Sequence, residues 1–262
     1  MTPRAMRLAL PLLALLACGG CMSVSSSDRS VDLKEAARLN VDGAAEYLRR
    51  GQFRDAKEKI EKALKQDPKY YKAHWVMALL QEQLDNPAQA DGYYKTAIRL
   101  QPEDPDITNT YAVYLCKSGK VDEALPLFEA LIRNKLYREP WAAATNAAVC
   151  LRADKRNADA LAYLERALTM QPAYVEAVIQ KADTLLAVGR GAPARQAVDS
   201  YLSLNKARES DPQRADVLLV GVRAALADGD RPGADNYARL LRRDFASSTQ
   251  TAALPQLLQG AK

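Results

Sequence analysis

The sequence is short of the residues from which enzyme sites are usually built. It contains one histidine in 262 residues, His74, and a lone histidine builds neither a metal site nor a catalytic triad. Neither a His-Glu-x-x-His motif nor a phosphate-binding loop occurs. Gly189-Arg190-Gly191 is interpreted as a turn between helices, where glycine serves the backbone geometry. We therefore expect no enzyme, catalytic residue, metal, cofactor or small-molecule substrate, and we expect His74 to pack between helices.

An excess of charge of one sign is also missing. The net charge is +5, and removing residues 1–17, which hold Arg4 and Arg7 and no acid, leaves +3. No dense run of lysine and arginine occurs. Such a balance is typical of a solvated surface of mixed charge. The sequence therefore predicts no nucleic-acid partner.

The apolar run near the N-terminus, Leu8 to Ala17, is short. A membrane-spanning helix needs ~20 apolar residues, and this run has about half that number. Arg4 and Arg7 precede it, and a positive start followed by a short apolar stretch is the form of a secretory signal. We expect residues 1–17 to be a signal peptide that is removed.

The residues that follow, Leu15-Leu16-Ala17-Cys18, resemble the lipobox of bacterial lipoproteins. The resemblance implies a lipid on the Cys18 thiol, cleavage before Cys18, and acylation of the new amine. Cys21 is an alternative that fits the pattern less well. Gly19, where aspartate would retain a lipoprotein in the inner membrane, implies the inner leaflet of the outer membrane, facing the periplasm. The alternative is a soluble periplasmic protein with coincidental cysteines.

Serine dominates the stretch after these cysteines. Ser23 to Ser30 contains five serines and no apolar period. Such a composition is typical of a flexible linker. We expect residues 18–36 to be a lipidated cysteine followed by a flexible tether.

Small residues and prolines recur along the rest of the chain at a fixed distance. Ala56, Ala63 and Pro68 reappear 34 residues later as alanine, alanine and proline at 90, 97 and 102. This is the period of the tetratricopeptide repeat, a pair of antiparallel helices. Proline ends the second helix because it cannot donate the next backbone hydrogen bond.

Six such units cover most of the chain. We place them at about 37–70, 71–104, 105–140, 141–174, 175–210 and 215–248. The third and fifth units lack the terminal proline, and the third has two extra residues. Neighbouring hairpins must stack to bury their apolar faces. The predicted fold is therefore an all-α, right-handed superhelical solenoid, with residues 249–262 as a C-terminal tail or cap.

Two further cysteines, Cys116 and Cys150, lie on the predicted first helices of the third and fourth units. These helices should be adjacent, and an exported protein meets oxidising conditions that permit a disulfide. Two buried, unpaired thiols would satisfy the same positions. Position alone leaves both interpretations open.

The inner wall of such an array is lined by the first helices. In the first two units, the positions expected to be exposed there form an apolar strip with a charged rim, which is a candidate site for a partner. The candidate groove residues are Val41, Ala45, Leu48, Arg49, Trp75 and Leu79. The alternative is that Trp75 and Leu48 pack against residues 31–36 or neighbouring helices. The partner would be an extended segment or a helix.

Two stretches resemble a known family more closely. The type IV pilus biogenesis lipoproteins, the PilF/PilW pilotins, share an Asn-Asn-Tyr-Gly…Leu-Cys stretch. This chain has a similar stretch at Asn109-Thr110-Tyr111-Ala112, followed by Leu115-Cys116. Asn146 to Cys150 is similar to the Asn-x-Gly-x-Cys stretch of the same family. Thr110, Ala112 and Ala148 depart from the pattern. The resemblance covers about residues 40 to 245.

The resemblance implies a pairing and a function. It implies that Cys116 and Cys150 form a disulfide. It also implies a scaffold that binds the outer-membrane secretin of the type IV pilus and promotes its localisation and assembly, supporting pilus biogenesis and twitching motility. A rival hypothesis is a tetratricopeptide lipoprotein that acts as an adaptor for cell-wall hydrolases or for outer-membrane barrel assembly.

Overall fold

The described part of the chain is built from helices alone. The computed structural model describes residues 26–205 and 211–259, and side chains from residue 32 onwards; within these ranges there are thirteen helices and no strand. In chain order they are α1 (Ser26–Arg49), α2 (Phe53–Gln66), α3 (Tyr71–Gln83), α4 (Pro87–Leu100), α5 (Pro105–Lys117), α6 (Val121–Arg133), α7 (Pro140–Ala153), α8 (Asn157–Met170), α9 (Val175–Ala187), α10 (Gly191–Leu204), α11 (Gln213–Ala227), α12 (Arg231–Asp244) and α13 (Thr249–Gln259). The expected all-α fold is confirmed.

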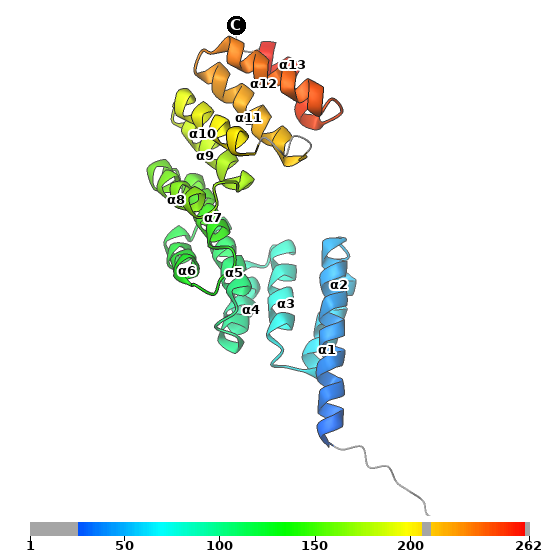
Figure 1. Ribbon diagram of the computed structural model, residues 1–262. Coiled ribbons are helices and arrows are strands. Elements are labelled where there is room, and N and C mark those ends of the chain that lie inside the picture. The colour runs from blue at the N-terminus through cyan, green and yellow to red at the C-terminus, as the bar shows by residue number, and fades with distance from the viewer. Residues whose placement is uncertain (1–25, 206–210, 260–262) are drawn as a thin grey trace, which may run out of the picture.

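The first twelve helices form six consecutive hairpins that stack side by side. Each hairpin pairs two helices that follow one another in the chain, from α1 with α2 to α11 with α12, and neighbouring hairpins contact one another. Figure 1 shows that the stack curves into an arc, with α1 at one end and α13 at the other. The curvature comes from the small rotation between successive units.

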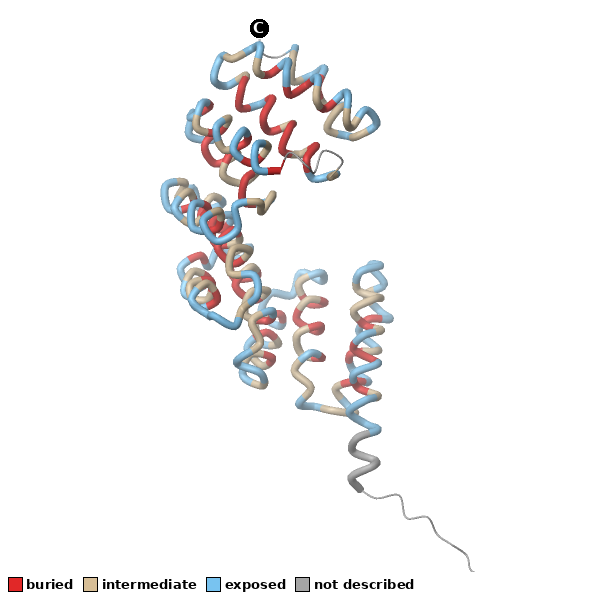
Figure 2. Tube along the Cα trace, in the orientation of Figure 1, coloured by how far each residue is buried: buried red, intermediate tan, exposed pale blue. Residues whose placement is uncertain are grey.

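Alanine allows the two helices of a hairpin to approach closely. In the first unit Ala44, Ala56 and Ala63 are completely buried, and the corresponding alanines of later units are buried as well. A larger side chain fills the space between them, such as Ile60, Tyr94 or Phe128, each with no exposed surface. Figure 2 shows the buried residues on the faces where helices meet. Burying one such side chain contributes about 1.5–3 kcal/mol.

The turn within each hairpin requires a left-handed backbone conformation. Glycine, which adopts it without steric cost, occupies this turn in four units: Gly51, Gly119, Gly189 and Gly229, with φ between +70° and +75°. The second and fourth units place Asp85 (φ +55°) and Lys155 (φ +62°) at the same step. The role expected for Gly189 is confirmed by its positive φ.

The expected tether is partly helical, which corrects our interpretation of residues 18–36. Helix α1 begins at Ser26. Extending an existing helix costs far less than starting one, and the lysine, glutamate and alanines of 34–37 favour helix. Arg38 adds ion pairs with Glu35 at 2.6 Å and Asp42 at 2.9 Å. The leader, Cys18 and Cys21 lie outside the described residues.

The C-terminal segment forms a helix against the last hairpin. Helix α13 lies against α11 and α12, and Leu254 is completely buried there. A terminal helix that covers the last apolar face is the expected way to end an array of repeats. None of the helices within the described ranges is both long and apolar enough to cross a membrane.

Candidate partner-binding groove

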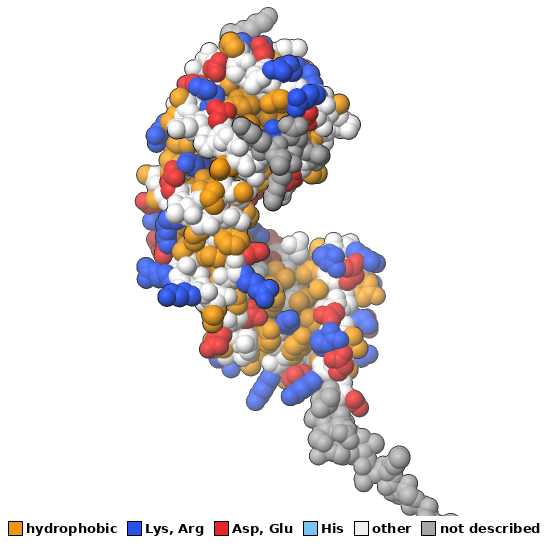
Figure 3. All heavy atoms as spheres, viewed as in Figure 1, with side chains coloured by type: hydrophobic (Ala, Val, Ile, Leu, Met, Phe, Trp, Pro, Cys, Tyr) orange, Lys and Arg blue, Asp and Glu red, His pale blue; other side chains and the backbone are white. Residues whose placement is uncertain are grey.

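The first helices of the hairpins lie next to one another and form one wall of the array. An ion-pair row crosses three of them: Asp183 of α9 lies 2.7 Å from Arg223 of α11 and 4.0 Å from Arg152 of α7. Figure 3 shows the molecule hollowed between its N-terminal and C-terminal repeats, with hydrophobic side chains on the walls of the hollow. Such concave walls are the binding surfaces of repeat arrays.

Four of the predicted groove residues keep part of their surface exposed. Trp75 and Leu79 of α3 are half-buried and pack against the central core of the array. Ala45 and Leu48 of α1 are also half-buried and pack against a separate core formed by the first hairpin and α3. The packing that we considered as an alternative therefore involves part of each side chain, and part remains open to solvent.

Val41 was wrongly placed on the exposed strip. Only 3% of its surface is exposed, and it belongs to the N-terminal core. It shares one face of α1 with Ala37 and Ala44, four residues before it and three after it, because these spacings bring side chains to the same side of a helix. Arg49 is exposed and pairs with Glu46 on its own helix.

The ring nitrogens of Trp75 and of its neighbour His74 differ in their hydrogen bonding. Its indole Nε1 is buried and has no hydrogen-bond partner among the described residues. His74 packs as expected: its ring lies 6.1 Å from that of Tyr93, and its Nε2 lies 2.9 Å from the Pro68 carbonyl oxygen. Within the described ranges no group of three or more histidine, cysteine, aspartate and glutamate residues could hold a metal ion.

Three tyrosines join the second and third hairpins, a feature that the sequence analysis did not identify. The rings of Tyr94, Tyr111 and Tyr114 lie 5.3–6.1 Å apart. The Tyr94 hydroxyl donates to Glu82, a residue of the groove wall. Tyr111 donates to Asp91 Oδ1 at 2.8 Å. The cluster therefore fixes the position of one wall residue from behind.

The environment of these tyrosines shifts their acidity. Burial first, and then the hydrogen bond to Glu82, raise the pKa of Tyr94. Burial alone would raise the pKa of Asp91, but the hydrogen bonds from Lys95 and Tyr111 outweigh it and the pKa falls below its usual value. Both carboxylates thus accept hydrogen bonds from tyrosines that stay protonated at neutral pH.

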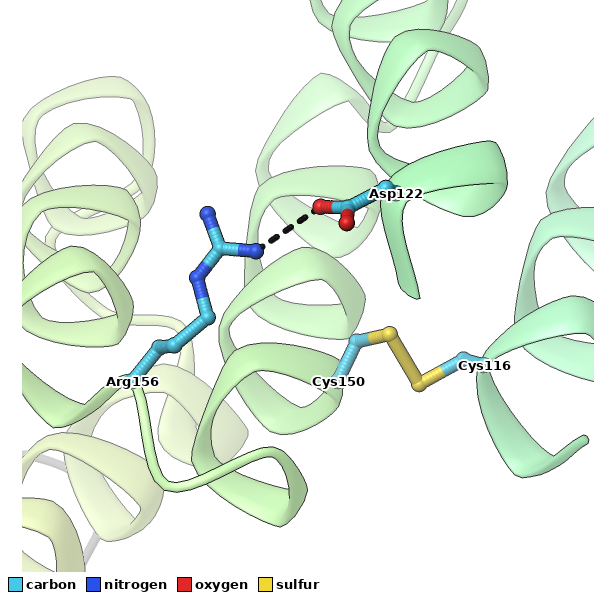
Figure 4. Close-up of a disulfide and its surroundings, with 4 residues drawn as sticks. All are labelled: Cys116, Asp122, Cys150 and Arg156. Carbon is cyan, nitrogen blue, oxygen red and sulfur yellow. Dashed lines mark hydrogen bonds and ion pairs between the residues drawn. A yellow bond between two sulfur atoms is a disulfide. The ribbon is translucent and has the colours of Figure 1, made fainter. Parts of the chain in front are cut away.

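A disulfide ties the third hairpin to the fourth. It joins Cys116 of α5 to Cys150 of α7, whose Cα atoms lie 5.5 Å apart, so the pairing implied by the family resemblance is present in the structure. Figure 4 shows an ion pair near it, from Arg156 Nη1 to Asp122 Oδ1 at 2.9 Å. The tie crosses the junction between the third and fourth hairpins, where the sequence has two extra residues.

A second ion pair joins the same two hairpins through their second helices. Both terminal guanidinium nitrogens of Arg166, Nη1 and Nη2, donate to the carboxylate of Glu129, at 2.5 and 3.2 Å. The hydrogen bond from Arg166 lowers the pKa of Glu129 below its usual value. A bidentate pair of this kind fixes orientation as well as distance. The third and fourth hairpins are therefore held together both through their first helices and through their second helices.

The comparison with protein families agrees with this architecture. Family models described as tetratricopeptide repeat match residues 41–107 and 112–175, and another with the same description matches 151–205. The first of these covers half of the chain. The chain therefore belongs to the tetratricopeptide-repeat family, whose members are scaffolds that bind proteins.

Its relatives narrow the class further. The chain is 27% identical over 252 residues to the type IV pilus assembly protein PilF of Pseudomonas aeruginosa, covering 95% of this chain and 97% of that protein. The solved structure of P. aeruginosa PilF is 26% identical and has a TM-score of 0.65, covering 88% of this chain and all of that one. Within the repeat family, the chain is therefore similar to the type IV pilus assembly protein PilF along nearly its whole length.

A second solved structure gives the same result. PilW, described as a widely conserved type IV pilus biogenesis factor, is 28% identical with a TM-score of 0.64, over 84% of this chain and 98% of that one. An uncharacterized protein of Haemophilus influenzae is 30% identical over 114 residues, which is 44% of this chain and 64% of that protein. The matches to PilF and PilW run along nearly the whole of each of those two proteins.

Proposed function

We propose that the chain is a pilotin: a scaffold, anchored in the outer membrane through a lipid on Cys18, that binds the type IV pilus secretin and promotes its localisation and assembly. The observation that carries the proposal is the near end-to-end similarity to PilF. The anchor rests on the lipobox-like sequence before Cys18. A lipid with two or three acyl chains would give stable attachment.

The wall of first helices supports binding rather than catalysis. Leu48, Trp75 and Leu79 offer half-buried apolar surface, and Arg49, which follows Leu48 in the chain, is exposed. An aromatic anchor with a charged rim suits a protein partner. A membrane-tethered groove would hold a secretin subunit at high local concentration near its site of insertion, and this task needs no bond chemistry.

The direct test is a pull-down with the lipidated chain from an envelope extract, followed by mass spectrometry. We expect the pilus secretin among the retained proteins. Recovery of a cell-wall hydrolase or a barrel-assembly component without the secretin would overturn the pilotin proposal.

Mass spectrometry of the N-terminal peptide identifies the lipidated cysteine. Lipid on Cys21 or on neither cysteine would refute the assignment to Cys18.

The groove is tested by Trp75→Ala combined with Leu48→Ala. We expect weaker secretin retention with unchanged helicity by circular dichroism. The matched control is Leu204→Ala, which removes an exposed leucine from the second helix α10, 66% exposed. Unchanged retention in the double variant would show that this strip is not the contact surface.

A further inference from the structure

The segment that joins the first hairpin to the second carries an unbalanced positive charge. Residues 62–72 run from the last turn of α2 to the start of α3, and we call them the first connection. They contain one acid, Asp67, and four lysines: Lys62, Lys65, Lys69 and Lys72. All four lysine side chains are exposed, and none forms an ion pair within the described ranges. The first connection therefore offers an excess of three positive charges to the solvent.

Packing does not account for these lysines, as the next repeat shows. Residues 96–106, the second connection, lie 34 positions later, and the helices on either side of them end and begin at the equivalent residues. The residues that replace the four lysines there are Thr96, Arg99, Glu103 and Asp106. With Asp104, the second connection has an excess of two negative charges. The same backbone thus accepts either sign of charge at this place.

The first connection lies at the end of the array where the chain enters it. Asn40 of α1 donates to Gln66 of α2 at 2.8 Å, so this part of α1 runs beside the connection. A hollow of about 360 Å³ is lined by both segments, through Lys34, Glu35, Arg38, Asp67 and Tyr70. Lys34 is exposed and without an ion pair in the described part of the chain. Figure 3 shows lysine or arginine side chains projecting from the end of the N-terminal hairpins at which α1 begins.

A lipid on Cys18 would keep a membrane close to this end of the array. The eight residues from Cys18 to Ser26, where α1 begins, can span at most about 28 Å. Helix α1 then rises about 12 Å to Lys34. Because the tether can reach further than α1 projects, the chain can bend back and bring the lysines onto the membrane surface.

We propose that the first connection, together with Lys34, is a docking surface for a membrane that contains anionic phospholipid such as phosphatidylglycerol. Each lysine held close to such a surface strengthens binding by about fivefold. The acidic second connection is repelled by the same surface. The array therefore stands on its first hairpin, and the later repeats rise away from the membrane.

This docking surface adds an orientation to the proposed function. It rests on the proposed lipid anchor for the membrane beside α1, and it holds the wall of first helices at a fixed height where a partner can reach it. An acidic protein could also bind these lysines. The membrane is the better candidate because the anchor brings it to this end of the array whichever protein is bound.

The test uses the full mature chain from residue 18 with Cys18→Ser and Cys21→Ser, so that only the protein surface can bind lipid. Flotation measures its partition onto vesicles of phosphatidylcholine and onto vesicles of phosphatidylcholine and phosphatidylglycerol in equal parts. We expect binding to the mixed vesicles alone. Binding should be lost when salt is raised from about 0.1 M to about 1 M, because the Debye length falls from about 10 Å to about 3 Å.

Matched variants locate the contact. The triple variant Lys65→Gln, Lys69→Gln, Lys72→Gln should partition onto the mixed vesicles at least about twentyfold more weakly. The control is Lys120→Gln, Lys135→Gln, Lys155→Gln, which removes the same charge from three exposed lysines of later repeats and should partition nearly normally. Circular dichroism checks that both variants keep their helices.

A readout on the lipidated, unsubstituted chain does not depend on any variant. Lysines are acetylated with the chain on each kind of vesicle and are then quantified by mass spectrometry. Lys62, Lys65, Lys69 and Lys72 should react more slowly on the mixed vesicles than on phosphatidylcholine alone. Lys155 should react equally on both.

Four results would overturn the docking surface. These are no binding to either vesicle, equal binding to both, equal losses in the two triple variants, or lysines that are not protected. Loss of the secretin from a pull-down with the Lys65, Lys69, Lys72 variant, without any binding to vesicles, would assign the lysines to the protein partner instead. Failure of the pilotin proposal is seen separately, as absence of the secretin or of lipid on Cys18 while the lipid-free chain still binds the mixed vesicles.

Discussion

Opening the disulfide between Cys116 and Cys150 should lower the free energy of unfolding by about 3.8 kcal/mol. The bond closes a loop of 34 residues, and the loss of chain entropy that such a loop imposes on the unfolded chain gives this value at 25 °C. The lost stability should be concentrated in repeats 3 and 4, because stability in a repeat array is a sum of local and nearest-neighbour contributions.

Urea unfolding of the oxidised and reduced chain, followed by circular dichroism, measures the difference. Cys18→Ser and Cys21→Ser remove the other two of the four cysteines. Comparing two redox states of one sequence avoids the packing change that a substitution at the fully buried Cys150 would add. Hydrogen exchange by mass spectrometry locates the effect, and we expect loss of protection in α5 and α7 before α1 or α12.

The matched control is the variant Cys116→Ala, Cys150→Ala, in which reductant should not change the free energy of unfolding. A difference below about 1 kcal/mol between the oxidised and reduced chain would refute the entropic argument, since it would place the effect far below the loop-closure value. Two free thiols in the chain isolated under oxidising conditions would refute the bond itself.

Three further predictions concern single positions. Gly191→Ala should destabilise by about 1–3 kcal/mol in thermal or urea unfolding, because the added Cβ would lie 2.7 Å from the Asp228 backbone nitrogen. Gly92→Ala is the control: its Cβ would meet nothing within 4 Å, so this change should stabilise by about 0.5–1 kcal/mol. Equal effects of the two substitutions would contradict the packing argument. Lys155→Gly should raise stability by about 0.5–1 kcal/mol by relieving a positive φ, and a loss would show that the turn is unstrained. Because the pKa of Glu129 is lowered in the folded chain, its carboxylate stabilises at neutral pH and this contribution fades as pH falls through the folded pKa. Glu129→Gln should therefore cost about 0.5–1 kcal/mol at pH 7 and progressively less as the pH falls below the ordinary glutamate pKa of about 4.3. A cost that does not shrink with falling pH would rule out the ion pair as its cause.

The sequence specified the repeats well because their signals are local and recurrent. The alanines at 56, 63, 90 and 97 have to be small wherever two helices meet, so they recur with the period of the fold and are all completely buried. The turn at Gly189 was recognisable for a similar reason, since a positive φ favours one residue type.

Other features depend on contacts that spacing does not record. Val41 occupies a position that is exposed in an average repeat, but here it lies on the face of α1 that meets the N-terminal core. The start of α1 at Ser26 is set by helix propagation from a packed segment, which composition alone does not indicate. The tyrosine cluster joins residues from two hairpins, and no local pattern marks it.

The left-handed turn within each hairpin has a consequence for anyone who would shorten or recombine this array. Both terminal hairpins use glycine there, at Gly51 and Gly229, while Asp85 and Lys155 lie in hairpins with neighbours on both sides. A truncated scaffold that ended on the second or fourth hairpin would lack the neighbouring hairpin on one side of such a turn. Such a scaffold should carry Asp85→Gly or Lys155→Gly from the start of its design.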